Sequence, residues 1–189
     1  MNELEILKLI WKDLTEPVSY IPLGFLTGII FAGCSVLLDL ICGKYIKKQG
    51  STGRMWLRAL CSFFLGVYLV VLAEQAFFSR PPGSRTGVSM TLLETWRGGA
   101  QSKAYVIENL LMFVPLGFLL PACIRRTRHL LSIVPLSFML SVLLEYVQYL
   151  TQRGHAQADD VLMNTLGSLC GFLIFVGLKQ LKMLLYPEK

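Results

Sequence analysis

Five long apolar stretches divide this chain, and they limit its fold more than any other feature. Each has about the 20 residues that an α-helix needs to cross a bilayer. Only helices and closed barrels satisfy backbone polar groups in lipid, and the continuous run 107–124 lacks the alternation of a barrel strand. The sequence therefore predicts an all-α protein, a polytopic transmembrane bundle of about five spanning helices. The predicted spans are 20–43, 55–78, 105–124, 130–150 and 160–179.

The composition argues against a soluble domain. Hydrophobic residues make up 54% of the chain and charged residues 16%, whereas soluble domains carry about 25% charged residues. The net charge of +6 comes from basic residues in short segments at the span ends, with no amphipathic basic stripe. We therefore expect membrane lipid and no nucleic acid as a partner, and we treat residues 1–189 as a single membrane domain.

The basic residues predict the orientation of the bundle. By the positive-inside rule, the segments after the first, third and fifth spans are cytoplasmic. The N-terminus, loop 79–104 and loop 151–159 are then outside, although loop 79–104 itself carries four basic residues. The prediction is N-out and C-in. The residues that carry it are Lys44, Lys47, Lys48, Arg54, Arg58, Arg125, Arg126, Arg128, Lys179 and Lys182.

Two segments outside the spans have patterns of their own. Residues 3–14 alternate apolar and charged groups, with Trp11 near the membrane end. This suits an outer interfacial helix within segment 1–18, or else a frayed tail, and nothing there resembles a signal peptide. Segment 80–87 is rich in turn residues and predicts an irregular loop, while residues 91–96 suit a short interfacial helix.

Small and sulfur-containing residues predict packing. Gly24 with Gly28, and Gly167 with Gly171, recur at a four-residue spacing that lets helix backbones approach closely, within the bundle before any dimer. The five cysteines form no CxxC pair, so we expect no zinc, redox or disulfide site and interpret them as small buried hydrophobic residues. Prolines in the third and fourth spans favour a kinked or widened cavity.

Polar residues inside the spans gather toward the predicted outer end. A carboxylate in hydrocarbon costs at least ~2.5 kcal/mol, so such residues usually face a protein interior or a wet cavity and mark function. Helical spacing places those of span four on one face and those of span five on another, and we expect the two faces to meet. The set comprises Glu74, then Glu108 and Asn109, then Ser141, Glu145, Gln148 and Gln152, and finally Asp160, Asn164, Gly167 or Ser168, and Gly171.

The acidic candidates have structural alternatives. Glu145 lies about a turn and a half below the outer surface and is the sharpest candidate, but it could form an ion pair with Arg153 or Arg80. Asp159 and Asp160 could begin and cap the fifth helix. The sequence therefore leaves both a functional and a structural role open for each of the three acids.

The other polar candidates are equally open. Asn109 and Asn164 could be interhelical hydrogen-bond partners. His155 could be only solvated. Asp39, near the cytoplasmic end of the first span, is expected to pair with a nearby lysine such as Lys44.

Three ordered motifs resemble the VanZ-like family. They are NLLMFVPLGFLLP at 109–121, SVLLEYVQ at 141–148, and Arg153 followed by DDVLMNTLGSLCG at 159–171. The resemblance is strong over 109–171, within a family-like core at 105–179, and general over the first two spans. It marks Asn109, Phe113, Pro115, Gly117, Glu145, Gln148, Arg153, Asp160, Asn164 and Gly167.

The resemblance implies a multi-pass protein of the bacterial plasma (inner) membrane with a cell-envelope role. The namesake of the family is linked to low-level resistance to the glycopeptide antibiotic teicoplanin. The family pattern often has a further acid or polar residue shortly after the arginine, where this chain has His155 and Gln157.

The first functional hypothesis is a binding protein. An outward-facing site of acids and amides would hold a glycan, a lipid headgroup, a cell-wall precursor or a glycopeptide, with Arg153 gripping a phosphate or carboxylate. The predicted binding residues are Glu108, Asn109, Gln148, Arg153, Asp159 and Asn164.

The second hypothesis is an intramembrane hydrolase or transferase acting on a lipid-linked glycan. Glu145 would be the general acid and Asp160, or Asp159, the base or nucleophile. No cofactor is predicted. The acids could instead hold a divalent metal for phosphoryl chemistry, although they match no standard metal motif. A proton-coupled transporter or purely structural bundle ranks last, because few polar residues continue toward the cytoplasmic side and no inverted repeat is evident. Whether the protein is an enzyme stays open.

Overall fold

The computed structural model describes residues 3–15, 19–46, 52–78, 83, 87–154 and 156–185. Arg80, His155 and most of the turn-rich segment 80–87 lie outside the described residues. The irregular loop predicted for 80–87 and the roles considered for those two residues therefore stay predictions.

Helices make up almost all of the described chain. Five of them, α2 to α6, are long and apolar enough to cross a membrane. The predicted all-α bundle with five spanning helices is therefore confirmed. The helices are α1 (Glu3–Thr15), α2 (Ile21–Ile46), α3 (Thr52–Ala73), α4 (Ala100–Cys123), α5 (Leu130–Leu150) and α6 (Ala158–Leu185), with a π-helical turn η2 (Glu74–Phe78) and the 3₁₀ turns η3 (Thr95–Arg97) and η4 (Arg125–Thr127).

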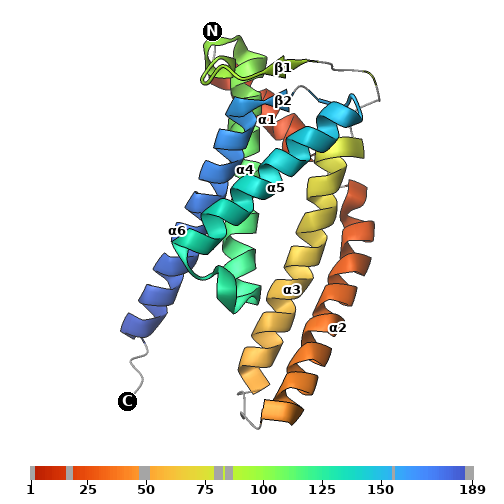
Figure 1. The fold of residues 1–189 in the computed structure, drawn as a ribbon, viewed down its shortest axis with the longest axis vertical. Helices are drawn as coiled ribbons and strands as arrows, with labels where there is room; N and C mark the ends of the chain where they lie inside the picture. The colour runs from red at the N-terminus through yellow and green to blue at the C-terminus, as the bar shows by residue number, and fades with distance from the viewer. Residues whose placement is uncertain are drawn as a thin grey trace.

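Two helix pairs and one inclined helix build the bundle (Figure 1). α2 and α3 form an antiparallel hairpin, α4 and α6 run parallel and in close contact, and α5 crosses obliquely and packs mainly on α6. The hydrophobic core lies where α3, α4, α5 and α6 meet. Its buried members are Leu65, Leu72, Phe113, Leu116, Leu119, Leu120, Ile133 and Phe172.

Glycines create the closest helix contacts, as predicted. A Cβ atom added at each of three glycines would lie 2.0 Å or less from a backbone carbonyl oxygen of the facing helix, so a larger residue would force α4 and α6 apart. Gly28 is similarly pressed against Phe63, at 2.8 Å, in the α2–α3 hairpin. The α4–α6 pairs are Gly117 with Ser168, Gly167 with Leu110, and Gly171 with Val114.

The polar residues of α5 and α6 face each other, but the small residues of α6 do not face α5. Ser137 Oγ lies 2.5 Å from Ser168 Oγ, and Asn164 Nδ2 donates to Ser141 Oγ at 2.8 Å. Gly167 contacts α4 instead. The predicted meeting of the two faces is therefore correct for their polar members only, because close backbone approach and side-chain hydrogen bonding use different sectors of α6.

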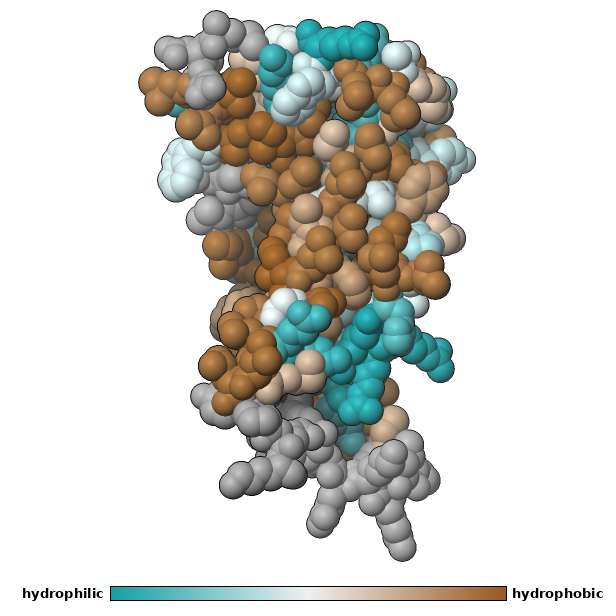
Figure 2. All heavy atoms as spheres, turned by 90° about the vertical axis from the view of Figure 1, so that its left-hand side faces the viewer, coloured by the Kyte–Doolittle hydropathy of each residue, from teal (hydrophilic) through white to brown (hydrophobic). Residues whose placement is uncertain are grey.

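On the face shown in Figure 2, apolar side chains cover the middle of the bundle, and hydrophilic side chains gather above and below them. Many large apolar side chains of the helices are exposed. Cys34, Cys42 and Cys170 are also exposed, and Cys61 and Cys123 are half-buried. All five thiols are free, but the predicted burial is wrong. In a membrane protein an apolar residue faces lipid as readily as the core, so hydrophobicity alone does not predict burial.

Asp39 pairs with Arg58, which joins α2 to α3. The antiparallel hairpin brings this basic residue of the facing helix next to the carboxylate. The pairing with a nearby lysine such as Lys44 stays a prediction, because the side chain of Lys44 lies outside the described part of the structure.

α1 is a helix and not a frayed tail. Ile10 is buried, and the helix packs against α4. Leu4, Leu7 and Trp11 form an exposed apolar face, with Trp11 71% exposed. The location of this face in a membrane interface stays a prediction.

A small parallel sheet joins two loops, which the sequence did not predict. β1 (Val88–Ser89) pairs with β2 (Ala156–Gln157), with Val88 opposite Ala156. These loop residues, 87–97, 151–154 and 156–157, lie at one end of the bundle, here called the loop end, and the Arg125–Thr127 turn and the end of α6 lie at the other (Figure 1). The predicted 91–96 helix is the shorter η3. Which end faces outside stays a prediction from charge.

Candidate substrate pocket

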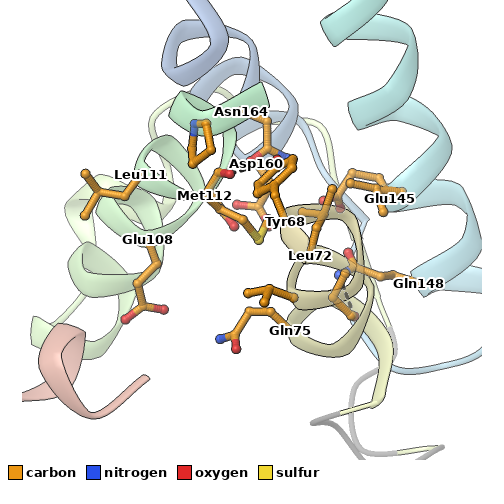
Figure 3. Close-up of a pocket in the computed structure, with 15 residues that line it drawn as sticks. Tyr68, Leu72, Gln75, Glu108, Leu111, Met112, Glu145, Gln148, Asp160 and Asn164 are labelled. Carbon is orange, nitrogen blue, oxygen red and sulfur yellow. Dashed lines mark hydrogen bonds between the residues drawn. The ribbon is translucent and has the colours of Figure 1, made fainter. Parts of the chain in front are cut away.

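A cavity of about 200 Å³ opens between four helices near the loop end (Figure 3). Fifteen residues line it, and they come from α3 with η2, α4, α5 and α6. The polar ones are Tyr68, Gln75, Glu108, Asn109, Glu145, Gln148, Asp160 and Asn164. The apolar ones are Val71, Leu72, Ala76, Leu111, Met112, Pro115 and Leu144.

The alternating direction of the helices brings these residues to one level. The pocket takes its residues from the last turns of α3 and α5, from the first turns of α6 and from the middle of α4. Six of the eight predicted site residues line the pocket, namely Glu108, Asn109, Glu145, Gln148, Asp160 and Asn164. Their roles in binding or catalysis stay predictions.

Asn164 is almost completely buried in the pocket wall, with 2% of its surface exposed. Its Nδ2 donates to Ser141 Oγ at 2.8 Å, which ties α6 to α5. Its Oδ1 is also buried, and no donor among the described residues reaches it. Buried polar atoms are nearly always hydrogen-bonded, so an acceptor of this kind needs an explanation.

Glu145 and Gln148 lie one turn apart on α5, and both are 7% exposed. Glu145 Oε2 accepts a hydrogen bond from the backbone N–H of Gln157 at 3.1 Å, which fixes β2 beside the pocket. Gln148 Nε2 donates to the carbonyl oxygen of Ala76 at 3.0 Å. These two side chains therefore connect α5 to the loop end and to η2.

Arg153 lies outside the set of residues that line the pocket. Its Nη1 donates to the carbonyl oxygen of Phe77 at 2.5 Å, and its guanidinium lies 5.7 Å from the centroid of the Phe78 ring. The carbonyls at the end of a helix lack intrahelical donors, and Arg153 supplies one to η2. Arg153 therefore stabilises η2, and its contact with a ligand phosphate or carboxylate stays a prediction.

Asp159 also lies outside the pocket lining, although it is the neighbour of Asp160. It is 2% exposed, and its two carboxylate oxygens accept hydrogen bonds from the backbone N–H groups of Leu93, at 2.5 Å, and Thr95, at 2.9 Å. Asp159 therefore anchors the loop before η3. It also lies in the first turn of α6, as expected for an acid that begins this helix, and its role in ligand binding stays a prediction.

Tyr68 and Gln75 line the pocket but were not among the predicted site residues. Tyr68 donates its hydroxyl hydrogen to the carbonyl oxygen of Met112 at 2.9 Å. Tyr68, Leu72 and Gln75 have the i, i+4, i+7 spacing of one helix face, a signal that the sequence contained. Glu74, which was considered instead, does not line the pocket.

The pocket lining is acidic. It contains three carboxylic acids and no lysine, arginine or histidine among the described residues. In Figure 3, Glu108 and Gln75 lie apart from Asp160 and Asn164, so the polar groups occupy different parts of the wall. No group of three or more His, Cys, Asp or Glu residues in the described part of the chain lies close enough to hold a metal ion. The arrangement is suited to accepting hydrogen bonds and attracting positive charge.

Comparison of the chain with known proteins finds one matching family. The family model described as VanZ/LLP1 matches residues 64–181. No curated protein and no solved structure matches the chain. The match includes every residue that lines the pocket and begins well before residue 109, where the resemblance in the sequence was strong. Because it covers more than half of the chain, the protein belongs to the VanZ/LLP1 family.

Proposed function

We propose that the pocket binds the polar headgroup of a lipid or lipid-linked glycan in the outer leaflet of the bacterial plasma membrane. The observation that carries this proposal is that six polar residues from α4, α5 and α6 line one cavity within the spanning helices. Carboxylates and amides are the usual partners of hydroxyl and amine groups. If the orientation is N-out and C-in, as the basic residues predict, the loop end and hence the pocket face the exterior side.

The size and lining of the pocket favour a headgroup over a whole glycopeptide. Its volume of about 200 Å³ is below the ~300–1,000 Å³ of pockets that hold drug-sized ligands. Apolar side chains make up nearly half of the lining, and Leu111 among them is 40% exposed. This mixture suits a ligand whose headgroup enters the cavity while its acyl or prenyl chain stays in the bilayer.

Such binding would explain a cell-envelope role. A protein that holds a lipid-linked cell-wall precursor alters the access of an antibiotic to that precursor, and the expected consequence is low-level teicoplanin resistance. Glu145 is the residue on which this effect should depend most, because it is a buried carboxylate in the pocket wall.

Titration of the purified full-length chain with a fluorescent lipid-linked disaccharide tests the proposal. Glu145→Gln should weaken binding about tenfold or more, because a hydrogen bond to a charged group contributes ~1.5–3 kcal/mol. Glu94→Gln is the matched control, since it makes the same change at an exposed position at the loop end, outside the pocket. Equal affinities for the two variants would contradict the proposal.

The same pair of variants can be tested in cells. Glu145→Gln should lower the teicoplanin concentration that the cells tolerate, with unchanged protein in the membrane, and Glu94→Gln should not. Unchanged resistance in the Glu145→Gln cells would show that resistance to teicoplanin does not depend on Glu145 in the pocket.

A second candidate function is hydrolysis of a lipid-linked glycan, favoured by the presence of Glu145 and Asp160 in one pocket. Glu145 would protonate the leaving oxygen as the glycosidic C–O bond breaks, and Asp160 would accept a proton from the water that attacks the anomeric carbon. Asp159 is not suited to the role of base, because both of its oxygens accept backbone hydrogen bonds.

Turnover measurements distinguish this candidate from binding alone. Asp160→Asn should abolish release of free sugar while the lipid-linked glycan still binds. An experimental structure with the carboxyl groups of Glu145 and Asp160 more than ~10 Å apart would exclude the mechanism.

A further inference from the structure

Basic side chains gather at the end of the bundle opposite the loop end. Arg125 and Arg126 are exposed on the η4 turn, and Arg128 follows them half-buried. Thr127 is buried between them, and its Oγ1 donates to the carbonyl oxygen of Ile124 at 2.8 Å. Figure 2 shows hydrophilic side chains at this end, below the apolar middle of the bundle. The turn that carries the arginines is therefore held by its own hydrogen bonds.

Arg128 connects this turn to α4 and α6. Its Nε donates to the carbonyl oxygen of Pro121 at 2.8 Å, and its guanidinium lies 5.8 Å from the centroid of the Phe175 ring. Lys179 and Lys182 follow Phe175 at the i+4 and i+7 spacing of one helix face, and both are exposed. The lysines of α6 therefore lie on the face against which the turn packs. We call the combined set the basic cluster, and it comprises Arg125, Arg126, Arg128, Lys179 and Lys182.

The protein supplies little negative charge to balance the basic cluster. Among the described residues at this end, Asp39 is the only acid, and it pairs with Arg58. Burial lowers the pKa of Arg128, and the positive charges of Arg125 and Arg58 lower it further. These guanidinium groups therefore lie close enough to repel one another, and an anion beside them would relieve the repulsion.

Exposed apolar side chains border the basic cluster. Ile124 directly precedes η4, Leu131 lies in the first turn of α5, and both are exposed. Leu178 and Leu181, next to the lysines of α6, are exposed as well. A patch that joins cations to apolar surface complements a phosphate attached to acyl chains. Soluble phosphates and nucleic acids offer the charge without the chains.

We infer that the basic cluster binds the phosphate headgroup of an anionic membrane lipid. The cluster lies at the end of the bundle opposite the pocket, so this second site is independent of the binding proposed for the pocket. Arginine binds phosphate oxygens through paired N–H groups, and lysine adds a compact positive charge. Because the cluster is built from the η4 turn and from α6, a lipid bound there would hold these two segments together.

Native mass spectrometry of the full-length chain in detergent tests this inference. The lipid probes are dioleoyl phosphatidylglycerol and dioleoyl phosphatidylcholine, which has the same acyl chains and no net charge. The soluble probes are glycerol 3-phosphate and a single-stranded oligouridylate. Phosphatidylglycerol should bind about tenfold or more tightly than phosphatidylcholine, because several basic residues contribute to its attraction. This preference should fall as the salt concentration rises.

Two double variants test whether the basic cluster is the origin of the preference. Arg125→Gln with Lys179→Gln removes two exposed charges from the cluster and should reduce the preference for phosphatidylglycerol about tenfold. Lys8→Gln with Arg97→Gln removes the same two residue types at exposed positions at the loop end and should keep it. Arg128 is left unchanged, because its contacts hold the turn. Unfolding temperatures show whether either variant fails to fold, and the comparison of headgroups on the unmodified protein needs no variant.

Several outcomes would overturn the inference. Equal binding of the two lipids would exclude a preference for negative charge. An equal loss of preference in the two double variants would show that the basic cluster is not its origin. Glycerol 3-phosphate that binds as tightly as phosphatidylglycerol would identify a soluble phosphate in place of a lipid, and displacement of phosphatidylglycerol by the oligouridylate would assign the cluster to nucleic acid.

Discussion

At the scale of single residues, the buried polar groups near the loop end divide into two kinds. Asn164, Glu145 and Asp160 line a cavity, whereas Asp159 and Arg153 satisfy backbone groups of neighbouring segments. Asp159 is the clearest of the second kind, because the loop that it holds includes Leu93 at φ 60°. Positive φ is unfavourable for a non-glycine residue, so this loop conformation depends on contacts that compensate for it.

Replacing Asp159 with asparagine should therefore loosen the loop. One of the two carboxylate oxygens that accept the N–H groups of Leu93 and Thr95 becomes an NH₂ group, which cannot accept. We expect a loss of ~1–3 kcal/mol from the local stability of the loop. Trypsin should then cleave at Arg97 many times faster than in the unmodified protein, as measured by the rate at which the corresponding peptide appears. Asp39→Asn is the control, since it makes the same change at the opposite end of the bundle and breaks a pair there. Equal cleavage rates for the two variants would contradict the anchoring role.

The chemistry of the single residues also explains which site residues were predictable from the sequence. Glu108, Asn109, Glu145, Gln148, Asp160 and Asn164 were predicted because a charged or amide group within an apolar helix is costly and conspicuous. The contacts of Arg153 and Asp159 were not predicted, because their partners are the backbone groups of Phe77, Leu93 and Thr95. Every residue type has such groups, so no sequence pattern marks them.

At the scale of the helices, close packing depends on small residues. The sequence shows where these residues are, but it does not show which neighbouring helix each of them contacts. Gly24 and Gly28 were expected to contact a neighbouring helix, and they contact α3. The glycines of α6 contact α4 and not α5, because the sector of α6 that carries Gly167 and Gly171 differs from the one that carries Asn164. The periodicity of the sequence predicts which residues share a helix face. Which neighbouring helix that face contacts depends on how all the helices of the bundle pack together.

Gly167→Ala should destabilise the bundle. The new Cβ would lie 1.9 Å from the carbonyl oxygen of Leu110, so α4 and α6 would have to move apart. Overpacking of this kind costs about 1–3 kcal/mol, or more where backbone must shift. Gly33→Ala and Gly177→Ala are matched controls, since no atom lies within 4 Å of either added Cβ. Thermal unfolding in detergent should show a lower midpoint for Gly167→Ala alone, and equal midpoints for all three variants would contradict the packing.

α1 offers a second test at this scale. Leu4, Leu7 and Trp11 form its exposed apolar face, which is expected to lie in the membrane interface. In a variant with Trp56→Phe and Trp96→Phe, the fluorescence of Trp11 should shift to shorter wavelengths in vesicles. It should be quenched most by lipids brominated near the headgroup. Strong quenching by aqueous iodide without any quenching by brominated lipid would place this face in water.

At the scale of the whole molecule, the two ends of the bundle differ, and the pocket lies near one of them. The loop end carries α1, the small sheet and the pocket, and the opposite end carries Arg125, Arg126 and the Asp39–Arg58 pair. The number of spanning helices was predictable, because about 20 apolar residues are needed for each crossing. Their ends were less so, since α4 already begins at Ala100 and α6 continues to Leu185. The parallel pairing of β1 with β2 was not, since each strand has only two residues and no alternation to detect.

The proposed binding of an outer-leaflet headgroup requires the loop end to face the exterior. In a variant without the five native cysteines, Thr91→Cys adds a thiol at an exposed position at the loop end, and Arg126→Cys adds one at the opposite end. A membrane-impermeant maleimide should label the first thiol in intact cells and the second only after permeabilisation, because the basic segment is expected to remain in the cytoplasm. The reverse pattern would leave the pocket and its acidic lining intact but turn them toward the inner leaflet. Cytoplasmic headgroups would then be the ligands to test, and a direct effect on an antibiotic outside the cell would lose its physical basis.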